Sequence, residues 1–368
     1  ACTITLPASA SNGDEIMFVD YARNWGTNGI VIDSNGLNYQ TQDDTYDVEY
    51  GTDGTALHIV YSGATNGWIP TLDKAVEDVP SKTYPNDEGI FGFGWTSGNT
   101  GVTNLVSNTG VVASDTAAVG TARHGPAACG YGGDKGIFIY GNLSGAQDIT
   151  NLVDNAGVVA SDVTGVGTAR YYMGACEYGG DKGIFGYGTG SLHNITNLVS
   201  NAGVVASDQA AATGTARYSL EACEYGGDKG IFGYGYISAA ASMTNLVSNT
   251  GVVASDVAGV GTARYYIAAC EYGGDKGIFG FGTTGSQSAV TNLVSNTGVV
   301  AADTAGVGTA RNALAACEYG QDKGIFGFGT TGSRTALTNL VSNTGVVASD
   351  QAASTGSARD NLAACSFN

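Results

Sequence analysis

The sequence predicts an all-β protein in which residues 88–368 form a six-bladed β-propeller, with a small β-domain at residues 1–72 and a linker at 73–87 before it. Three observations predict this architecture. The 368 residues include 58 Gly, 20 Tyr and 11 Phe but only 5 Pro, a composition typical of short strands joined by tight turns. The C-terminal part repeats itself six times, and each repeat divides into four short strand-like runs.

Three recurring segments define the repeat, at intervals of 46 to 48 residues. Thr-Asn-Leu-Val begins at Thr103, Thr150, Thr196, Thr244, Thr291 and Thr338. Gly-Ile-Phe begins at Gly89, Gly136, Gly183, Gly230, Gly277 and Gly324. An arginine with a cysteine six residues later stands at Arg123, Arg170, Arg217, Arg264, Arg311 and Arg359. A repeat of this length has the size of one propeller blade.

One repeat illustrates the four-stranded blade that we expect. Its strands are predicted at Arg264–Tyr272, Gly277–Gly282, Thr291–Val294 and Val299–Ala302. The Gly-Gly-Asp and Asn-Thr-Gly segments between them supply residues that adopt positive φ in tight hairpins.

The second strand predicts how neighbouring blades pack. Strict alternation would place Phe279 and Phe281 on one face, and Ile278, Gly280 and Gly282 on the other. An aromatic face and a face notched by glycine are complementary, so each blade would seat its rings against the next. Burial of one ring contributes roughly 1.5–3 kcal/mol.

Closure of the ring follows from the order of the strands. The first repeat begins at a second strand, near Gly89, and the chain ends after a first strand, Arg359–Cys365. Pairing these two strands would complete the sixth blade and remove the open sheet edges. An open solenoid is the alternative, and it would leave both ends uncapped.

Seven cysteines occur, Cys2 and one at the same place in each repeat. The repeat cysteines are Cys129, Cys176, Cys223, Cys270, Cys317 and Cys365. Equivalent positions in neighbouring blades should lie beyond the ~7 Å Cα separation that a disulfide allows. We therefore expect small buried hydrophobic side chains, and no metal site, because no Cys-x-x-Cys spacing is present.

The first 72 residues lack the repeat but also read as strands. We expect strands at Thr3–Leu6, Glu15–Tyr21, Gly29–Ile32, Tyr46–Tyr50 and Ala56–Ser62. The acidic residues 73–87 would link this β-domain to the propeller.

The charge distribution excludes several partners. The net charge is −18, and 11 of the 12 basic residues after position 87 are fixtures of the repeat, which leaves no basic patch. Nucleic acid and anionic membrane are therefore poor partners. No apolar stretch approaches the ~18 residues that span a bilayer, so we expect no membrane insertion.

The sequence also lacks the patterns of catalysis. Three scattered histidines, His58, His124 and His193, form no ligand spacing, and neither a nucleophile elbow nor a P-loop occurs. Most carboxylates belong to the repeat, as Asp115 and Asp162 do, and sixfold copies favour architecture over a single active site. We expect a non-enzymatic protein without cofactor or metal.

The six repeat arginines admit two interpretations. In the first, each guanidinium ties down a loop between blades, with an Asp eight or nine residues earlier as its partner. In the second, the ring lines the mouth of the channel and binds an anionic ligand. The Asp181-Lys182 turn and its copies are expected to be solvated hairpins, since they supply too few oxygens for calcium.

The repeats differ from one another mainly in two loops that map to one face. One loop joins the second and third strands, and the other follows the repeat arginine. Loops on a rigid scaffold are where recognition usually occurs, although unconstrained drift would produce the same variation. The candidate ligand-binding residues are Trp95, His124, Tyr171, Tyr172, His193, Tyr218, Tyr236, Tyr265, Tyr266, Asn312 and Arg334.

Two resemblances add to these patterns. A Gly-Gly pair, a small blade and an arginine entering the first strand resemble the kelch family, although here the Gly-Gly precedes the second strand and no repeat Trp exists. The runs Thr3-Ile-Thr-Leu-Pro-Ala-Ser and Gly29-Ile-Val-Ile, with the repeat Tyr-Gly-Gly-Asp-Lys-Gly-Ile-Phe, resemble tail-fibre and other virion structural proteins of tailed bacteriophages.

The second resemblance implies a surface appendage of the virion, made in the host cytoplasm and extracellular when active. It further implies a homotrimer that contacts other virion proteins through the N-terminal domain and a host-surface glycan or protein through the variable face. A structural or decoration protein of the virion and a secreted bacterial adhesin are the alternatives.

Overall fold

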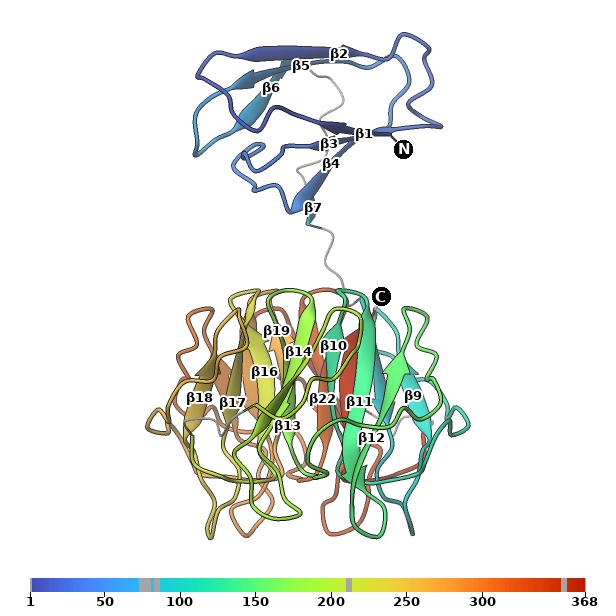
Figure 1. Ribbon diagram of the computed structural model, residues 1–368, viewed down its shortest axis with the longest axis vertical. Coiled ribbons are helices and arrows are strands. Elements are labelled where there is room, and N and C mark those ends of the chain that lie inside the picture. The colour runs from blue at the N-terminus through green and yellow to red at the C-terminus, as the bar shows by residue number, and fades with distance from the viewer. Residues whose placement is uncertain (1, 73–80, 83–86, 210–213, 352–355, 368) are drawn as a thin grey trace. The chain divides into compact units, whose positions relative to one another are not determined.

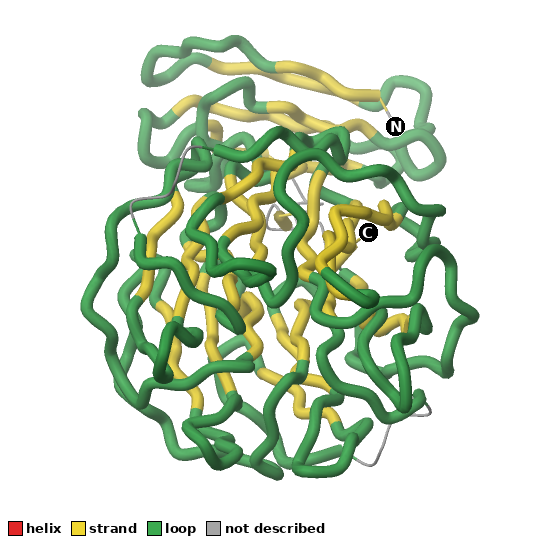
Figure 2. Tube along the Cα trace, turned by 60° about the horizontal axis from the view of Figure 1, so that its bottom comes forward, coloured by secondary structure: helices red, strands yellow, loops and turns green. Residues whose placement is uncertain are grey.

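The computed structural model describes residues 2–72, 81–82, 87–209, 214–351 and 356–367. These residues form strands, turns and loops, and no helix among them could cross a membrane. Figure 2 shows the same composition of strands and loops. The chain divides into two compact units, Ala1–Tyr84 and Pro85–Asn368. The predicted all-β class is therefore confirmed.

The described residues of the first unit form two sheets (Figure 1). One has the order β1 (Cys2–Thr5), β3 (Ile30–Asp33), β4 (Tyr46–Tyr50) and β7 (Ser81–Lys82), and the other β2 (Glu15–Val19), β5 (Ala56–Tyr61) and β6 (Trp68–Leu72). Their inward residues form one core, because alternation along β3 and β5 buries Ile30 and Ile32 with Leu57 and Ile59.

The strands expected in this unit are present, with ends that shift by at most two residues. Strands β6 and β7 were not predicted. Strand β7 falls inside the segment 73–87 that was predicted as a linker, and 73–80 and 83–86 of that segment lie outside the described residues.

The second unit contains six three-stranded antiparallel sheets among its described residues (Figure 1). In the order of pairing they are β25 (Ala363–Phe367), β8 (Glu88–Gly92) and β9 (Thr103–Val106); β10 (Ala127–Tyr131), β11 (Lys135–Asn142) and β12 (Ala146–Val153); β13 (Gly174–Tyr178), β14 (Lys182–Gly186) and β15 (Thr196–Val199); β16 (Glu221–Tyr225), β17 (Lys229–Gly233) and β18 (Thr244–Val247); β19 (Ala268–Tyr272), β20 (Lys276–Gly280) and β21 (Thr291–Val294); and β22 (Ala315–Tyr319), β23 (Lys323–Gly327) and β24 (Thr338–Val341).

The two ends of the second unit meet in one sheet. Strand β25 pairs antiparallel with β8, and Cys365 lies opposite Ile90. The predicted pairing of the last strand with the first repeat is confirmed. The first strand of each sheet contacts the first strands of the sheets before and after it, and β25 contacts both β22 and β10.

The prediction of a fourth strand in each repeat is wrong. In the repeat that contains β21, the segment after the turn makes only two isolated bridges to that strand, Val294 with Val300 and Thr291 with Thr304. Between them the Asn292 side-chain amide donates to Ala301 O at 3.1 Å. This side chain replaces a main-chain partner, so the segment bulges away from a continuous ladder.

Each buried cysteine packs against the glycine that opens the second strand of the next sheet. A β-carbon on Gly230 would lie 2.5 Å from Cys176 Sγ, and one on Gly136 would lie 2.5 Å from Cys365 Sγ. The recurring Gly-Ile-Phe therefore begins with glycine because a sulfur atom of the neighbouring sheet occupies that space.

The two aromatic residues of the second strand point to opposite neighbours, so the prediction that they share a face is wrong. The Phe279 ring lies 5.2 Å from that of Tyr234, and it fills the space beside Gly233. The Phe281 ring instead lies 5.1 Å from that of Phe326. Alternation fails because the strand ends just before Phe281, which has a φ of 61°.

Candidate functional site

The structure joins the two variable loops of each repeat. The residue after each repeat arginine forms an isolated bridge with the loop that follows the second strand. These bridges are His124–Asn142, Tyr171–Thr189, Tyr218–Tyr236, Tyr265–Thr283, Asn312–Thr330 and, where the chain ends meet, Asp360–Trp95. The two sets of candidate residues consequently lie together.

A ring of main-chain hydrogen bonds links the same loops from one repeat to the next. Tyr172 N donates to Gly125 O at 2.9 Å, and Gly125 N donates to Asn361 O at 2.8 Å. The remaining bonds run from Ser219 N to Tyr172 O, from Tyr266 N to Ser219 O, from Ala313 N to Tyr266 O and from Asn361 N to Ala313 O. All six residues have a φ between 52° and 61°, which turns each amide toward the preceding repeat.

Eight of the candidate residues form a continuous series of ring contacts, which we call the aromatic band. Its order is Trp95, His124, Tyr171, Tyr172, Tyr266, Tyr265, Tyr236 and Tyr218, and neighbouring ring centroids lie 4.8 to 6.5 Å apart. All eight side chains are half-buried. The band therefore combines fixed ring positions with surface that a ligand can reach.

A cleft of about 320 Å³ opens at one end of the aromatic band. Its lining residues are Trp95, His124, Tyr172, Arg334, Asp360 and Asn361. The first of these follows β8 and the last two precede β25, so both ends of the second unit build the cleft.

The charged groups of the cleft form one ion pair. Arg334 Nε lies 3.2 Å from Asp360 Oδ2, and Asn361 Nδ2 donates to Asp360 Oδ1 at 3.0 Å. Asp360 is buried, and its main chain pairs with that of Trp95. These contacts hold the carboxylate in one orientation with lone pairs left for a ligand.

His124 presents a hydrogen-bond acceptor to the cleft. Asn99 Nδ2 donates to Leu143 O at 2.9 Å, which leaves Asn99 Oδ1 to accept from His124 Nδ1 at 2.7 Å. Burial lowers the pKa of His124, although Asp360 acts in the opposite direction. At neutral pH the ring is uncharged, and Nε2 carries a free lone pair.

A cavity of about 40 Å³ lies beside the main-chain ring, lined by residues of all six repeats. Its one acidic residue among the described lining is Glu221, which stands where the other repeats have Ala or Gly. Burial raises the pKa of Glu221 to about 8. The carboxyl is therefore largely protonated at neutral pH.

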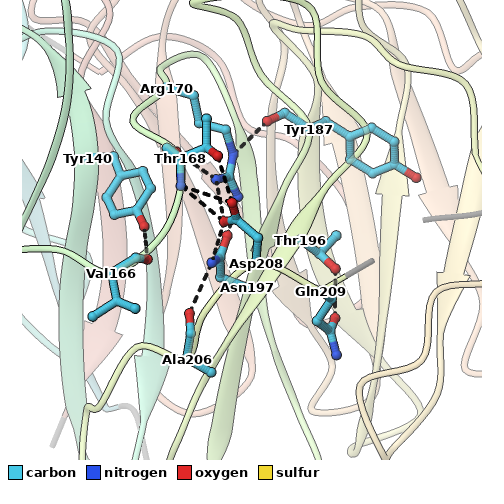
Figure 3. Close-up of polar contacts among 10 residues, drawn as sticks. All are labelled: Tyr140, Val166, Thr168, Arg170, Tyr187, Thr196, Asn197, Ala206, Asp208 and Gln209. Atoms are coloured by element: carbon cyan, nitrogen blue, oxygen red, sulfur yellow. Dashed lines mark hydrogen bonds and ion pairs between the residues drawn. The ribbon is translucent and has the colours of Figure 1, made fainter. Parts of the chain in front are cut away.

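The repeat arginines are interior side chains, as Arg170 illustrates in Figure 3. Its Nε donates to Tyr187 O at 2.9 Å, its Nη1 to Thr168 O at 2.9 Å and its Nη2 to Asn197 Oδ1 at 2.5 Å. Asp208 Oδ1 lies 3.7 Å from Nη1. Burial lowers the pKa of Arg170 to about 10, so the guanidinium stays charged at neutral pH.

This network corrects two expectations. Arg123, Arg170, Arg217, Arg264, Arg311 and Arg359 are 0% exposed and cannot line a channel mouth. The acidic partner also belongs to the next repeat, as Asp208 does for Arg170 and, where the chain ends meet, Asp115 does for Arg359, and does not lie eight or nine residues before the arginine. The arginines tie loops to strands, as the structural interpretation held.

The remaining candidates lie outside the aromatic band. His193 is half-buried, and its pKa is lowered by burial and by Arg170. Asn312 pairs with Thr330 by main-chain bonds of 2.9 and 3.0 Å. At the turn predicted to be solvated, Asp181 forms an ion pair with Lys182 and accepts a hydrogen bond from Asn201, as a hairpin would.

Four contributors were not predicted as site residues: Asn99, Asp360, Asn361 and Glu221. For Asp360 and Glu221 the sequence did carry a signal, because each is an acid at a position where the other repeats have none. No protein-family model matches the chain, and no curated protein matches it.

Proposed function

We propose that the second unit is a closed, six-bladed, kelch-like β-propeller in which each three-stranded sheet is one blade. Three observations support this architecture: the pairing of β25 with β8, the contact of β25 with both β22 and β10, and the main-chain ring through all six repeats. A ring of blades needs no terminal cap, because its ends pair with each other.

We further propose that this propeller is a receptor-binding module without catalytic activity and that its receptor is a glycan on a host surface. The observation that carries this proposal is the aromatic band, a continuous half-exposed series of eight rings on loops of a rigid scaffold. Such rings stack on the apolar faces of sugars, and the tyrosine hydroxyls bond to sugar hydroxyls.

The resemblance of the repeat to tail-fibre proteins makes a virion appendage the setting that we propose for this activity. The first unit would then attach to other virion proteins or join copies of the chain, a homotrimer in the form that the resemblance implies. Several copies on one particle would combine weak individual sites into firm adhesion.

Binding by a double variant tests the proposal. We expect Tyr171→Ala with Tyr265→Ala to weaken binding to a glycan array and to a panel of bacterial cells at least tenfold, because two rings of the band are lost. The matched control is Val252→Ala with Val299→Ala, which trims two side chains that are 64% exposed. An assay for reducing sugar ends in the same samples measures whether the protein cleaves the glycans that it binds.

Equal binding by the double variant and the control would contradict the role of the band. Release of reducing ends by the intact protein would contradict the absence of catalysis. Failure of the folded, intact protein to bind any glycan or cell would sink the receptor proposal.

One observation favours a second candidate, a structural or decoration role on the virion. One valine after the last turn of each repeat is 60 to 64% exposed, at Val111, Val158, Val204, Val252, Val299 and Val346. Six equivalent exposed valines would offer one apolar contact per repeat to a partner on the virion. If the role is structural, the Val252→Ala, Val299→Ala variant should fail to assemble onto the virion, whereas the Tyr171→Ala, Tyr265→Ala variant should assemble normally.

A further inference from the structure

We infer that the cleft between Trp95, Arg334 and Asp360 is a subsite for one neutral sugar ring, so that the receptor carries an uncharged pyranose with free hydroxyl groups. This inference rests on the proposed glycan binding and names the sugar class. The cleft volume of about 320 Å³ is enough for a single ring and its substituents.

The first argument is electrostatic. Among the described residues that line the cleft, Arg334 and Asp360 carry the formal charges, and they neutralise each other across 3.2 Å. An acidic sugar that bonds to Arg334 would place its carboxylate beside that of Asp360, and the two like charges would repel each other. The net charge of −18 also repels anionic glycans at longer range.

The second argument concerns hydrogen bonds. Asp360 and the uncharged ring of His124 offer acceptors, and the outer guanidinium nitrogens of Arg334 offer donors. A sugar hydroxyl donates one bond and accepts others, so vicinal hydroxyls can engage both kinds of group. Because Asp360 is already held by Asn361 and Arg334, little ordering is needed on binding.

The third argument is the shape of the apolar wall. The rings of Trp95 and His124 meet at 80° with centroids 5.3 Å apart, so the two form adjoining walls of the cleft. Both side chains are half-buried, which fixes their positions while leaving surface exposed. A pyranose can place its C–H face on the indole while its hydroxyls reach the ion pair.

The neighbouring repeat provides an internal comparison. Thr283 bridges Gln287 in the way that Thr330 bridges Arg334, and Asn312 follows its arginine as Asp360 does. The junction of the chain ends therefore carries an ion pair where the repeat before it has two uncharged amides. Gln287, the counterpart of Arg334, supplies a matched control variant.

The experiment measures binding of the intact protein to polymer conjugates of glucose, galactose, mannose, glucuronic acid and N-acetylneuraminic acid. We expect a neutral conjugate to bind more tightly than either acidic one. Arg334→Ala and Asp360→Asn should each weaken that binding at least tenfold, whereas Gln287→Ala, which removes the side chain equivalent to Arg334 in the repeat before, leaves it unchanged. Thermal unfolding checks each variant, and Arg334→Ala carries the test if the buried Asp360→Asn variant fails to fold.

Tighter binding of an acidic conjugate would overturn the inference, and so would intact affinity in Arg334→Ala. Binding to cells or an array without binding to any neutral conjugate would overturn it as well. In each of these cases, weaker binding of the Tyr171→Ala, Tyr265→Ala variant to the array and to cells would still support the proposed receptor function. Failure of the sugar inference can therefore be distinguished from failure of the receptor proposal.

Discussion

Single residues acquire their meaning from comparison among the six repeats. Glu221 replaces the small apolar residue of the other copies, and Asp360 stands where other copies have His, Tyr or Asn. The conserved arginine could be recognised from its spacing, but burial decided between its two interpretations. The spacing of the repeats locates these arginines in the sequence, but it does not show whether their side chains are buried or exposed.

We predict that the Glu221→Ala variant loses less stability than the wild type when the pH is raised from 5 to 9. The pKa of Glu221 is about 8 in the folded protein against an ordinary 4.5, so the folded state binds more protons between these values. The free energy of unfolding therefore falls as pH rises through that window, by several kcal/mol at ~1.4 kcal/mol for each unit of pKa difference. Calorimetric melting at pH 5 and pH 9 measures the difference between variant and wild type.

At pH 9 the variant should melt at the higher temperature, whereas at pH 5 the advantage should vanish. Glu221→Gln, which keeps the volume without the charge, should behave in the same way. A parallel pH dependence of wild type and both variants would contradict the prediction.

At the scale of elements, the sequence predicted the paired strands well and the irregular segments poorly. Gly-Ile-Phe and Thr-Asn-Leu-Val lie in β20 and β21, short apolar strands that are buried at consecutive positions, and their recurrence between turn residues made them recognisable. Two predictions failed, the fourth strand of each repeat and the face on which Phe281 lies, and both failed because of contacts made only in the folded protein. The Asn292 side chain takes the place of a ladder bond, and Phe281 adopts positive φ to reach Phe326.

We predict that Gly230→Ala destabilises the protein by about 1 to 3 kcal/mol, because the new β-carbon would lie 2.5 Å from Cys176 Sγ. In a Cys176→Ala background the sulfur is absent, so the cost should fall by at least about 1 kcal/mol. Urea unfolding of the four proteins in this double-mutant cycle measures the coupling.

Gly145→Ala is the matched control, since nothing lies within 4 Å of its added β-carbon, and it should be nearly neutral. Additive costs in the cycle would mean that the sulfur is not what requires glycine at the start of the second strand.

At the scale of the whole molecule, counting strands predicted that the chain ends pair, and β25 does pair with β8. The cleft could not be predicted in this way. Trp95 and Asp360 come from opposite ends of the second unit, so the sequence can mark each residue separately but does not show that their side chains line one cleft.

We predict that the thiols report on the cooperative unfolding of the second unit. Cys2 is exposed and should react at once with a disulfide reagent, whereas the six repeat cysteines are buried and should not. Burial raises the pKa of Cys365 to about 12 and suppresses its reactive thiolate. Quantifying labelled thiols by mass spectrometry, with and without denaturant, measures both classes.

The six buried thiols should become reactive together, at the denaturant concentration where fluorescence shows half of the protein unfolded. Stepwise labelling of single repeats in native buffer would contradict cooperative opening and indicate that individual sheets separate on their own.

The main-chain ring of Gly125, Tyr172, Ser219, Tyr266, Ala313 and Asn361 joins the repeats through amides and carbonyls alone. Five different residue types occupy its six positions, because the bond depends on a backbone angle and not on a side chain. The variable loops can therefore accumulate substitutions without loosening the contacts between repeats. Under the proposed receptor function, a lineage that meets a new receptor could change its recognition chemistry residue by residue while the scaffold stays the same.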